Sequence, residues 1–267
     1  MSSAHEYNRR AWDRRARQQE RFTRPATDDD LRDPLRKLDG SGWLGDVVGK
    51  RLLCLAAGGG RQSLMYAAAG AHVTVVDISE EMLAIDRHMA AQKGFDIVVV
   101  QASMDDLSIL DRASFELVIH PVSTCYVPNI HVVYREVARV ILPGGIYVSQ
   151  HKQPTSLQAT VGVSARGYYE ITEPYFERGP LPPVSGSLHR EEGTLEFLHR
   201  WEEIIGGLCR AGFVIEDLTE PHHADPDAKP GEFGHRSQFI PPYVRIKARR
   251  TEDQPFPPQP KVWLPGE

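Results

Sequence analysis

From residue 51 onward, short apolar runs alternate with amphipathic stretches along the chain. This alternation is typical of a parallel sheet flanked by helices. The apolar runs predict strands at residues 51–57, 72–77, 96–101, 115–120, 146–150, 213–218 and 243–247. The amphipathic stretches predict helices at about 61–69, after Ser79, at 129–140 and at 194–211. Leu142-Pro-Gly-Gly145 is expected to end the helix at 129–140, because proline and glycine do not continue a helix.

Three segments lie outside this alternation. Residues 1–50 begin with an arginine-rich amphipathic helix from about Tyr7 to Gln19, and a connector broken by proline and glycine follows, with one short helix expected. Residues 153–193 combine prolines, glycines and aromatic residues, which predicts a cap or lid inserted into a domain spanning residues 51–250. The proline-rich tail 251–267 is expected to be loosely held.

Charge and composition limit the classes of partner that the protein is expected to bind. A net charge of -5 at neutral pH gives no long-range attraction for nucleic acid or for an anionic membrane, so a small-molecule partner is favoured. No stretch approaches eighteen consecutive apolar residues, and the three cysteines show no CxxC spacing. We therefore expect a cytoplasmic protein without a disulfide framework, a zinc site or a membrane span.

A cluster of glycines, Gly58-Gly-Gly60, ends the first predicted strand and leads into a helix. Glycine lets a ligand approach the backbone closely, and Asp77 ends the next strand nineteen residues later, where a carboxylate can accept both hydroxyls of a ribose. This arrangement predicts a nucleoside site. An NAD(P)-dependent oxidoreductase that uses the same glycine loop remains an alternative, although Ser63 stands where the dinucleotide motif needs its third small residue. A non-catalytic nucleoside-binding protein is the third possibility.

Further motifs follow in a consistent order: Leu53–Gly60, Val76–Met82, Arg139–Gly145 and Ala211–Phe213, preceded by the entry helix Tyr7–Asp13. In this order the chain resembles the class I S-adenosylmethionine-dependent methyltransferases over about residues 7–247. The resemblance implies an α/β fold with a Rossmann-like, seven-stranded, mostly parallel sheet, helices on both faces and an antiparallel last strand. It also implies S-adenosyl-L-methionine as methyl donor, S-adenosyl-L-homocysteine as product, and a small-molecule methyl acceptor.

The resemblance also implies which residues hold the cofactor. Gly58 and Gly60 would pass close to it, Asp77 would hold the ribose, Met82 and Met104 would enclose the adenine, and His120 would lie beside the sulfonium. The full predicted set is Ala57, Gly58, Gly60, Asp77, Ile78, Met82, Ser103, Met104 and His120. The chain departs from the family pattern at Cys54, where an acid is usual, at Ala56, where the first glycine is usual, and at Ser103, where an acid is usual.

Candidate bases for removing a proton from the acceptor are few. His120 ends the fourth predicted strand and Tyr126 follows in the same loop, so these two are the predicted catalytic residues. His151 is a weaker candidate, and His199 is expected inside a helix, as a buttress. Methyl transfer itself asks mainly for in-line positioning, so a base is needed only where the acceptor is a hydroxyl or an ammonium.

Three further expectations concern other residues. The run His222–Asp227 is not expected to bind metal, because adjacent histidines point in different directions. Cys125 is expected to be a buried structural cysteine. Tyr7 and Trp12 are predicted to close the cofactor pocket from the N-terminal helix.

Overall fold

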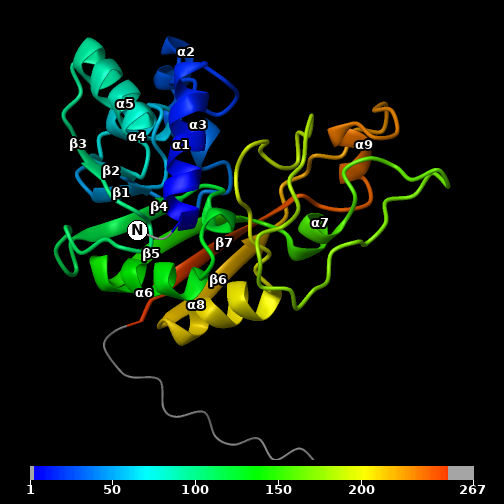
Figure 1. The fold of residues 1–267 in the computed structure, drawn as a ribbon. Coiled ribbons are helices and arrows are strands. Elements are labelled where there is room, and N and C mark those ends of the chain that lie inside the picture. Colours follow the sequence, from blue (N-terminus) through cyan, green and yellow to red (C-terminus); the bar gives the residue numbers. More distant parts are fainter. Residues whose placement is uncertain (1–2, 252–267) are drawn as a thin grey trace, which may run out of the picture.

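The computed structural model describes residues 3–251 and contains one seven-stranded sheet, shown in Figure 1. The strands are β1 Arg51–Leu55, β2 His72–Asp77, β3 Ile97–Gln101, β4 Phe115–His120, β5 Ile141–Lys152, β6 Phe213–Thr219 and β7 Tyr243–Arg250. Their spatial order is β3-β2-β1-β4-β5-β7-β6. Strands β1 to β5 pair in parallel, and β7 is antiparallel to both β5 and β6. The predicted sheet is therefore confirmed, including its antiparallel last strand.

Helices cover both faces of the sheet (Figure 1). Alternate residues of β1 enter different cores: Leu53 and Leu55 pack with α6 Ile130–Val140 and α8 Gly207–Arg210, whereas Leu52 and Cys54 pack on the face covered by α4 Gln62–Ala68 and α5 Glu80–Lys93. This alternation follows from the two-residue period of a strand.

Helix α5 has defined ends. Its N-cap Ser79 accepts a hydrogen bond from the Met82 N–H, as the sequence predicts, and Gly94 ends the helix in the left-handed region at φ 70°.

The N-terminal segment lies on the α5 side. Helix α1 Ser3–Arg17 packs against α5, and the connector forms two short helices, α2 Asp28–Arg32 and α3 Pro34–Leu38, where one was expected. A capping box of Thr27 and Asp30 begins α2.

Two predicted elements are present but begin at other residues than expected. Strand β5 begins at Ile141 rather than Ile146. Leu142-Pro-Gly-Gly145 is therefore part of this strand, where it forms a bulge opposite β4, and it is not a turn that precedes the strand. The helix expected from residue 194 begins only at Trp201, with a π-helical turn, η2 Glu202–Gly206, before α8. Residues 194–200 are extended because their backbone pairs with other segments: Phe197 N–H donates to Cys125 O and Leu181 N–H to Glu196 O.

The insertion after β5 contains the short helix α7 Pro154–Gln158 and long loops, and it packs with the loop that carries α9 Phe233–Ser237 (Figure 1). The fully buried Arg236 ties the two together, because its guanidinium donates to the carbonyl oxygens of Ser156, Ala159 and Thr160. The tail predicted from residue 251 lies outside the described residues from 252 onward. Within residues 3–251, no helix has both the length and the apolar character that crossing a bilayer requires.

Candidate active site

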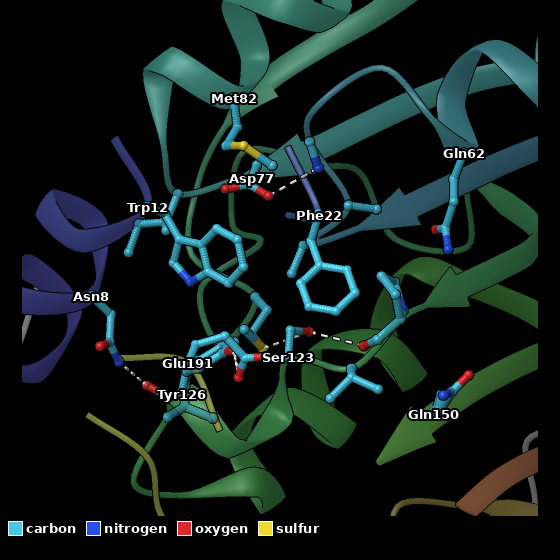
Figure 2. A pocket seen from close by; sticks show the side chains of 18 of the residues that line it. Asn8, Trp12, Phe22, Gln62, Asp77, Met82, Ser123, Tyr126, Gln150 and Glu191 are labelled. Atoms are coloured by element: carbon cyan, nitrogen blue, oxygen red, sulfur yellow. Dashed lines mark hydrogen bonds between the residues drawn. The ribbon is translucent and has the colours of Figure 1, made fainter. Parts of the chain in front are cut away.

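A cavity of about 410 Å³ opens at the carboxyl ends of β1 to β4 (Figure 2). Its floor comes from the turns that follow these strands, which contribute Ala56–Gly58, Asp77 with Ile78, Ser103 with Met104, and residues 121–123. The strand order reverses between β1 and β4, and α/β sheets bind ligands at such a point. The cavity is therefore where this fold is expected to hold its ligand.

The glycine loop is held from below by two carboxylates. Gly58 N–H donates to Asp77 Oδ2 at 2.9 Å, and Gly59 N–H donates to Asp86 Oδ2 at 2.7 Å. A side chain at residue 58 would place its Cβ 2.8 Å from Met82 Cβ, so only glycine fits there. The loop thus presents bare backbone to the cavity.

Asp77 stands at the end of β2 with both carboxylate oxygens engaged, since Oδ1 accepts from Ser79 N–H at 2.9 Å. Burial raises the pKa of Asp77, and the backbone N–H donors of Ser79 and Gly58 partly oppose that rise. Met82 lies directly beside Asp77 in the cavity wall, as Figure 2 shows.

The opposite end of the cavity is aromatic. Trp12 of α1 packs edge-on against Tyr126, with ring centroids 5.6 Å apart, and Phe22 projects into the space between the two ends (Figure 2). Phe233 and Tyr243 complete this wall. Such a wall suits a ligand with an apolar, planar body.

Tyr126 meets a buried ionic cluster behind the aromatic wall. Its hydroxyl donates to Glu191 Oε2 at 2.7 Å, and Lys152 Nζ lies 2.6 Å from the same oxygen. Lys152 also donates to Glu196, which accepts from Arg190. Burial raises the pKa of Tyr126 well above its ordinary value, so this residue is a neutral hydrogen-bond donor.

His120 lies outside the cavity lining. Its ring is buried, with Nδ1 2.7 Å from Tyr147 Oη and Nε2 2.7 Å from Ser123 Oγ. Burial lowers the pKa of His120 to about 3, so the ring is neutral. Ser123, which does line the cavity, thus connects His120 to it through the contact with Nε2.

The two other histidines considered from the sequence are also buried. His151 contacts Thr124 and Ser149, and His199 lies 2.9 Å from Thr124 O. The prediction that His199 sits inside a helix is wrong, because the helix begins after it.

The structure brings most of the predicted site residues together. The cavity is lined by Ala57, Gly58, Asp77, Ile78, Met82, Ser103, Met104, Tyr126 and Trp12. Gly60 and His120 do not line it, and neither does Tyr7, whose side chain is exposed. Cys125 is buried.

Several lining residues were not found from the sequence. Glu191 stands in a run of charged residues that is typical of an exposed turn, and Phe22 in a connector. His223 belongs to the run considered only for metal, yet it lines the cavity with its ring packed between Phe233 and Tyr243. In the described part of the chain, no three metal-ligating side chains are grouped to hold an ion.

Comparisons with known proteins agree with this geometry. The model of a family described as a methyltransferase domain matches residues 53–149. The uncharacterized methyltransferase YbaJ of Bacillus subtilis (strain 168) is 37% identical over 182 residues, which cover 67% of this chain and 71% of YbaJ. The ubiquinone biosynthesis O-methyltransferase of Aeromonas salmonicida (strain A449) is 30% identical over 67% of this chain and 69% of its own length.

Solved structures show the same likeness. An S-adenosylmethionine-dependent methyltransferase from Mesorhizobium loti superposes with a TM-score of 0.65 and 26% identity, covering 82% of this chain and all of that one (100%). The sheet order, the glycine loop with its acid, and these relatives lead to one family. The chain belongs to the class I S-adenosylmethionine-dependent methyltransferases.

Proposed function

We propose that the cavity holds S-adenosylmethionine at its glycine-loop end and a small-molecule methyl acceptor at its aromatic end. The observation that carries this proposal is that a single cavity joins the loop residues after β1 to β4 with the aromatic wall. Relatives named as a ubiquinone biosynthesis O-methyltransferase and a demethylmenaquinone methyltransferase support a small acceptor.

The residues of the loop end fit the cofactor. Gly58 lines the cavity, and only glycine fits at this position, since a Cβ there would collide with Met82. The Asp77 carboxylate accepts one backbone N–H on each oxygen, and a carboxylate has about four acceptor positions, so capacity remains for two ribose hydroxyls. Met82 and Met104 are buried and line the cavity, which suits contact with an adenine ring.

When bound, the cofactor supplies an electrophilic methyl group on a sulfonium sulfur. The protein's contribution is then position and exclusion of water. Asp77 and the glycine loop fix the donor, while Trp12 and Tyr126 form the wall that holds the acceptor in line. Because both ring nitrogens of His120 are engaged, we assign it a positioning role through Ser123.

The test is a calorimetric titration with S-adenosylhomocysteine and, separately, with NAD. We expect binding of S-adenosylhomocysteine and no comparable binding of NAD. Methyl transfer from labelled S-adenosylmethionine to a panel of small hydroxyl, amine and thiol compounds should then give labelled product. NAD binding without S-adenosylhomocysteine binding, or transfer only to protein or RNA, would contradict the proposal.

A further inference from the structure

All residues of the insertion at 153–193 are described, and Glu191 is the one acidic side chain that they contribute to the cavity wall. We propose that Glu191 selects the methyl acceptor by accepting a hydrogen bond from a neutral hydroxyl group of that acceptor. This inference rests on the proposed function and names the acceptor class for the same cavity. Glu191 lies beside Tyr126 in the cavity wall, as Figure 2 shows. Its side chain is only 8% exposed.

The two oxygens of Glu191 have different surroundings. Oε2 accepts from Tyr126 Oη at 2.7 Å and from Lys152 Nζ at 2.6 Å, so it is satisfied by the wall. Apart from the adjoining Glu196 carboxyl, no group within residues 3–251 hydrogen-bonds to Glu191 at Oε1, and this oxygen is not among the polar atoms that the protein fully encloses. Oε1 is therefore open to the cavity, where a ligand hydroxyl can replace solvent as its hydrogen-bond donor.

The ionic cluster keeps Glu191 charged and immobile. The positive charge of Lys152 lowers the pKa of Glu191 to about 2 despite its burial. Lys152 is held in turn by Glu196, which also accepts from Arg190 at 2.6 Å. Because Glu191 cannot turn away without breaking these contacts, Oε1 is a fixed acceptor in a mainly apolar wall.

Charge decides between a hydroxyl and an ammonium as the donating group. Lys152 and Arg190 balance Glu191 and Glu196, so the cluster carries no net negative charge. Arg21 and Arg61 line the same cavity, Asp77 lies at its glycine-loop end, and the sulfonium of the cofactor adds a further positive charge. The arginines and the sulfonium would therefore repel an ammonium group, and the negatively charged Glu191 oxygen would repel a carboxylate or phosphate group. A neutral hydroxyl satisfies Oε1 without either cost.

The experiment measures binding of three probes to the full-length protein saturated with S-adenosylhomocysteine. The probes are 2-naphthol, 2-methoxynaphthalene and 2-naphthylmethylammonium, which share a planar body for the aromatic wall and differ in the polar group. A hydrogen bond to a charged acceptor predicts that 2-naphthol binds at least about tenfold more tightly than the methoxy probe. The ammonium probe should bind more weakly than 2-naphthol.

Glu191→Gln should reduce the preference for 2-naphthol to less than about threefold, because its single carbonyl oxygen must satisfy Tyr126 and Lys152 and its amide then faces the cavity as a donor. Glu192→Gln is the matched control, since Glu192 is the exposed neighbour outside the cavity lining, and it should leave the preference unchanged. Thermal unfolding of each variant checks the fold, and the wild-type preference tests the inference even where a variant fails to fold.

Equal binding of 2-naphthol and the methoxy probe to wild type, or tightest binding of the ammonium probe, overturns the role of Glu191 and leaves the proposed function standing. Binding of S-adenosylhomocysteine without binding of any probe overturns the small-acceptor function, and this inference with it.

Discussion

Asp86→Asn tests how the glycine loop is held. Asp86 is fully buried on α5, where it accepts the Gly59 N–H at 2.7 Å and contacts the Ser63 hydroxyl. Burial raises the pKa of this carboxyl from 3.8 to about 6, although the hydrogen bonds from Ser63 and Gly59 oppose the rise. Asparagine keeps the shape, since its oxygen can accept from Gly59 and its amide can donate to the Ser63 hydroxyl.

The magnitude follows from linkage. Between pH 4 and pH 6 the folded protein binds a proton at Asp86 that the unfolded chain has released, so this group's contribution to stability falls as pH rises through that window. A rise from 3.8 to about 6 corresponds to roughly 3 kcal/mol at about 1.36 kcal/mol per pKa unit. The asparagine variant has no titrating group at residue 86, so its free energy of unfolding does not fall with rising pH for this reason.

The assay is urea unfolding of wild type and Asp86→Asn at a series of pH values from 4 to 7. The free energy of unfolding of the variant minus that of wild type should rise by about 2–2.5 kcal/mol across the range, because part of the full effect already lies below pH 4. Ser63→Ala gives the opposite control: it removes a hydrogen bond that lowers the pKa of Asp86, so the loss of stability should extend to higher pH. A difference between wild type and Asp86→Asn that stays constant with pH would refute the reasoning.

Four other changes have expected outcomes. Asp77→Ala should weaken S-adenosylhomocysteine binding by about ten- to several-hundred-fold in calorimetry, through the loss of charge-assisted hydrogen bonds of about 1.5–3 kcal/mol each, and unchanged affinity would contradict its ribose role. Ala56→Gly should raise the free energy of unfolding by about 0.5–1 kcal/mol in urea, because Ala56 lies at φ 48°, where glycine is favoured. Trp12→Ala should weaken binding of 2-naphthol to the protein saturated with S-adenosylhomocysteine by about tenfold, because Trp12 belongs to the aromatic wall, whereas Tyr7→Ala, at an exposed site outside the cavity, should not; equal effects would show that α1 acts only through stability. Hydrogen exchange in residues 153–193 should slow when S-adenosylhomocysteine and an acceptor bind, and an already protected, unchanged segment would reject a mobile lid.

The parallel part of the fold could be predicted from the sequence because its signal is local. Each buried strand is a continuous apolar run, and the N-cap of α5 is visible as Ser79. The failures share a cause, since long-range pairing overrides local preference. Leu142-Pro-Gly-Gly145 has the composition of a turn, yet parallel pairing with β4 draws Ile141 into the sheet. Residues 194–200 have no strong helix start signal, and their backbone is held by segments far away in the chain.

The two ends of the candidate site differ in the same way. The residues of the glycine-loop end follow directly after strands. Strand prediction alone therefore brings Gly58, Asp77 and Met104 together at the carboxyl edge of the sheet. Glu191 and His223 line the aromatic end of the cavity and lie on long loops, and no periodic pattern fixes the position of a loop. His120 shows the limit of the strand argument: the end of β4 was predicted, but the burial of its ring behind Ser123 depends on the contact with Tyr147.

Helix α1 links these two ends. Near its middle, Asn8 donates to Tyr126 O at 2.9 Å and accepts from Leu195 N–H at 2.7 Å, which fixes the aromatic wall. Five residues later, Asp13 accepts from the Ser79 hydroxyl at 2.6 Å, at the turn that follows Asp77. Five residues of helix span only about 7.5 Å, so α1 sets a short, rigid distance between the turn after Asp77 and the wall that contains Tyr126, the proposed donor and acceptor sites. In-line displacement depends on that distance, because small misplacements of the reacting atoms lower the rate steeply. We therefore infer that α1, although outside the sheet, aligns the two ligands and does more than cover the cavity.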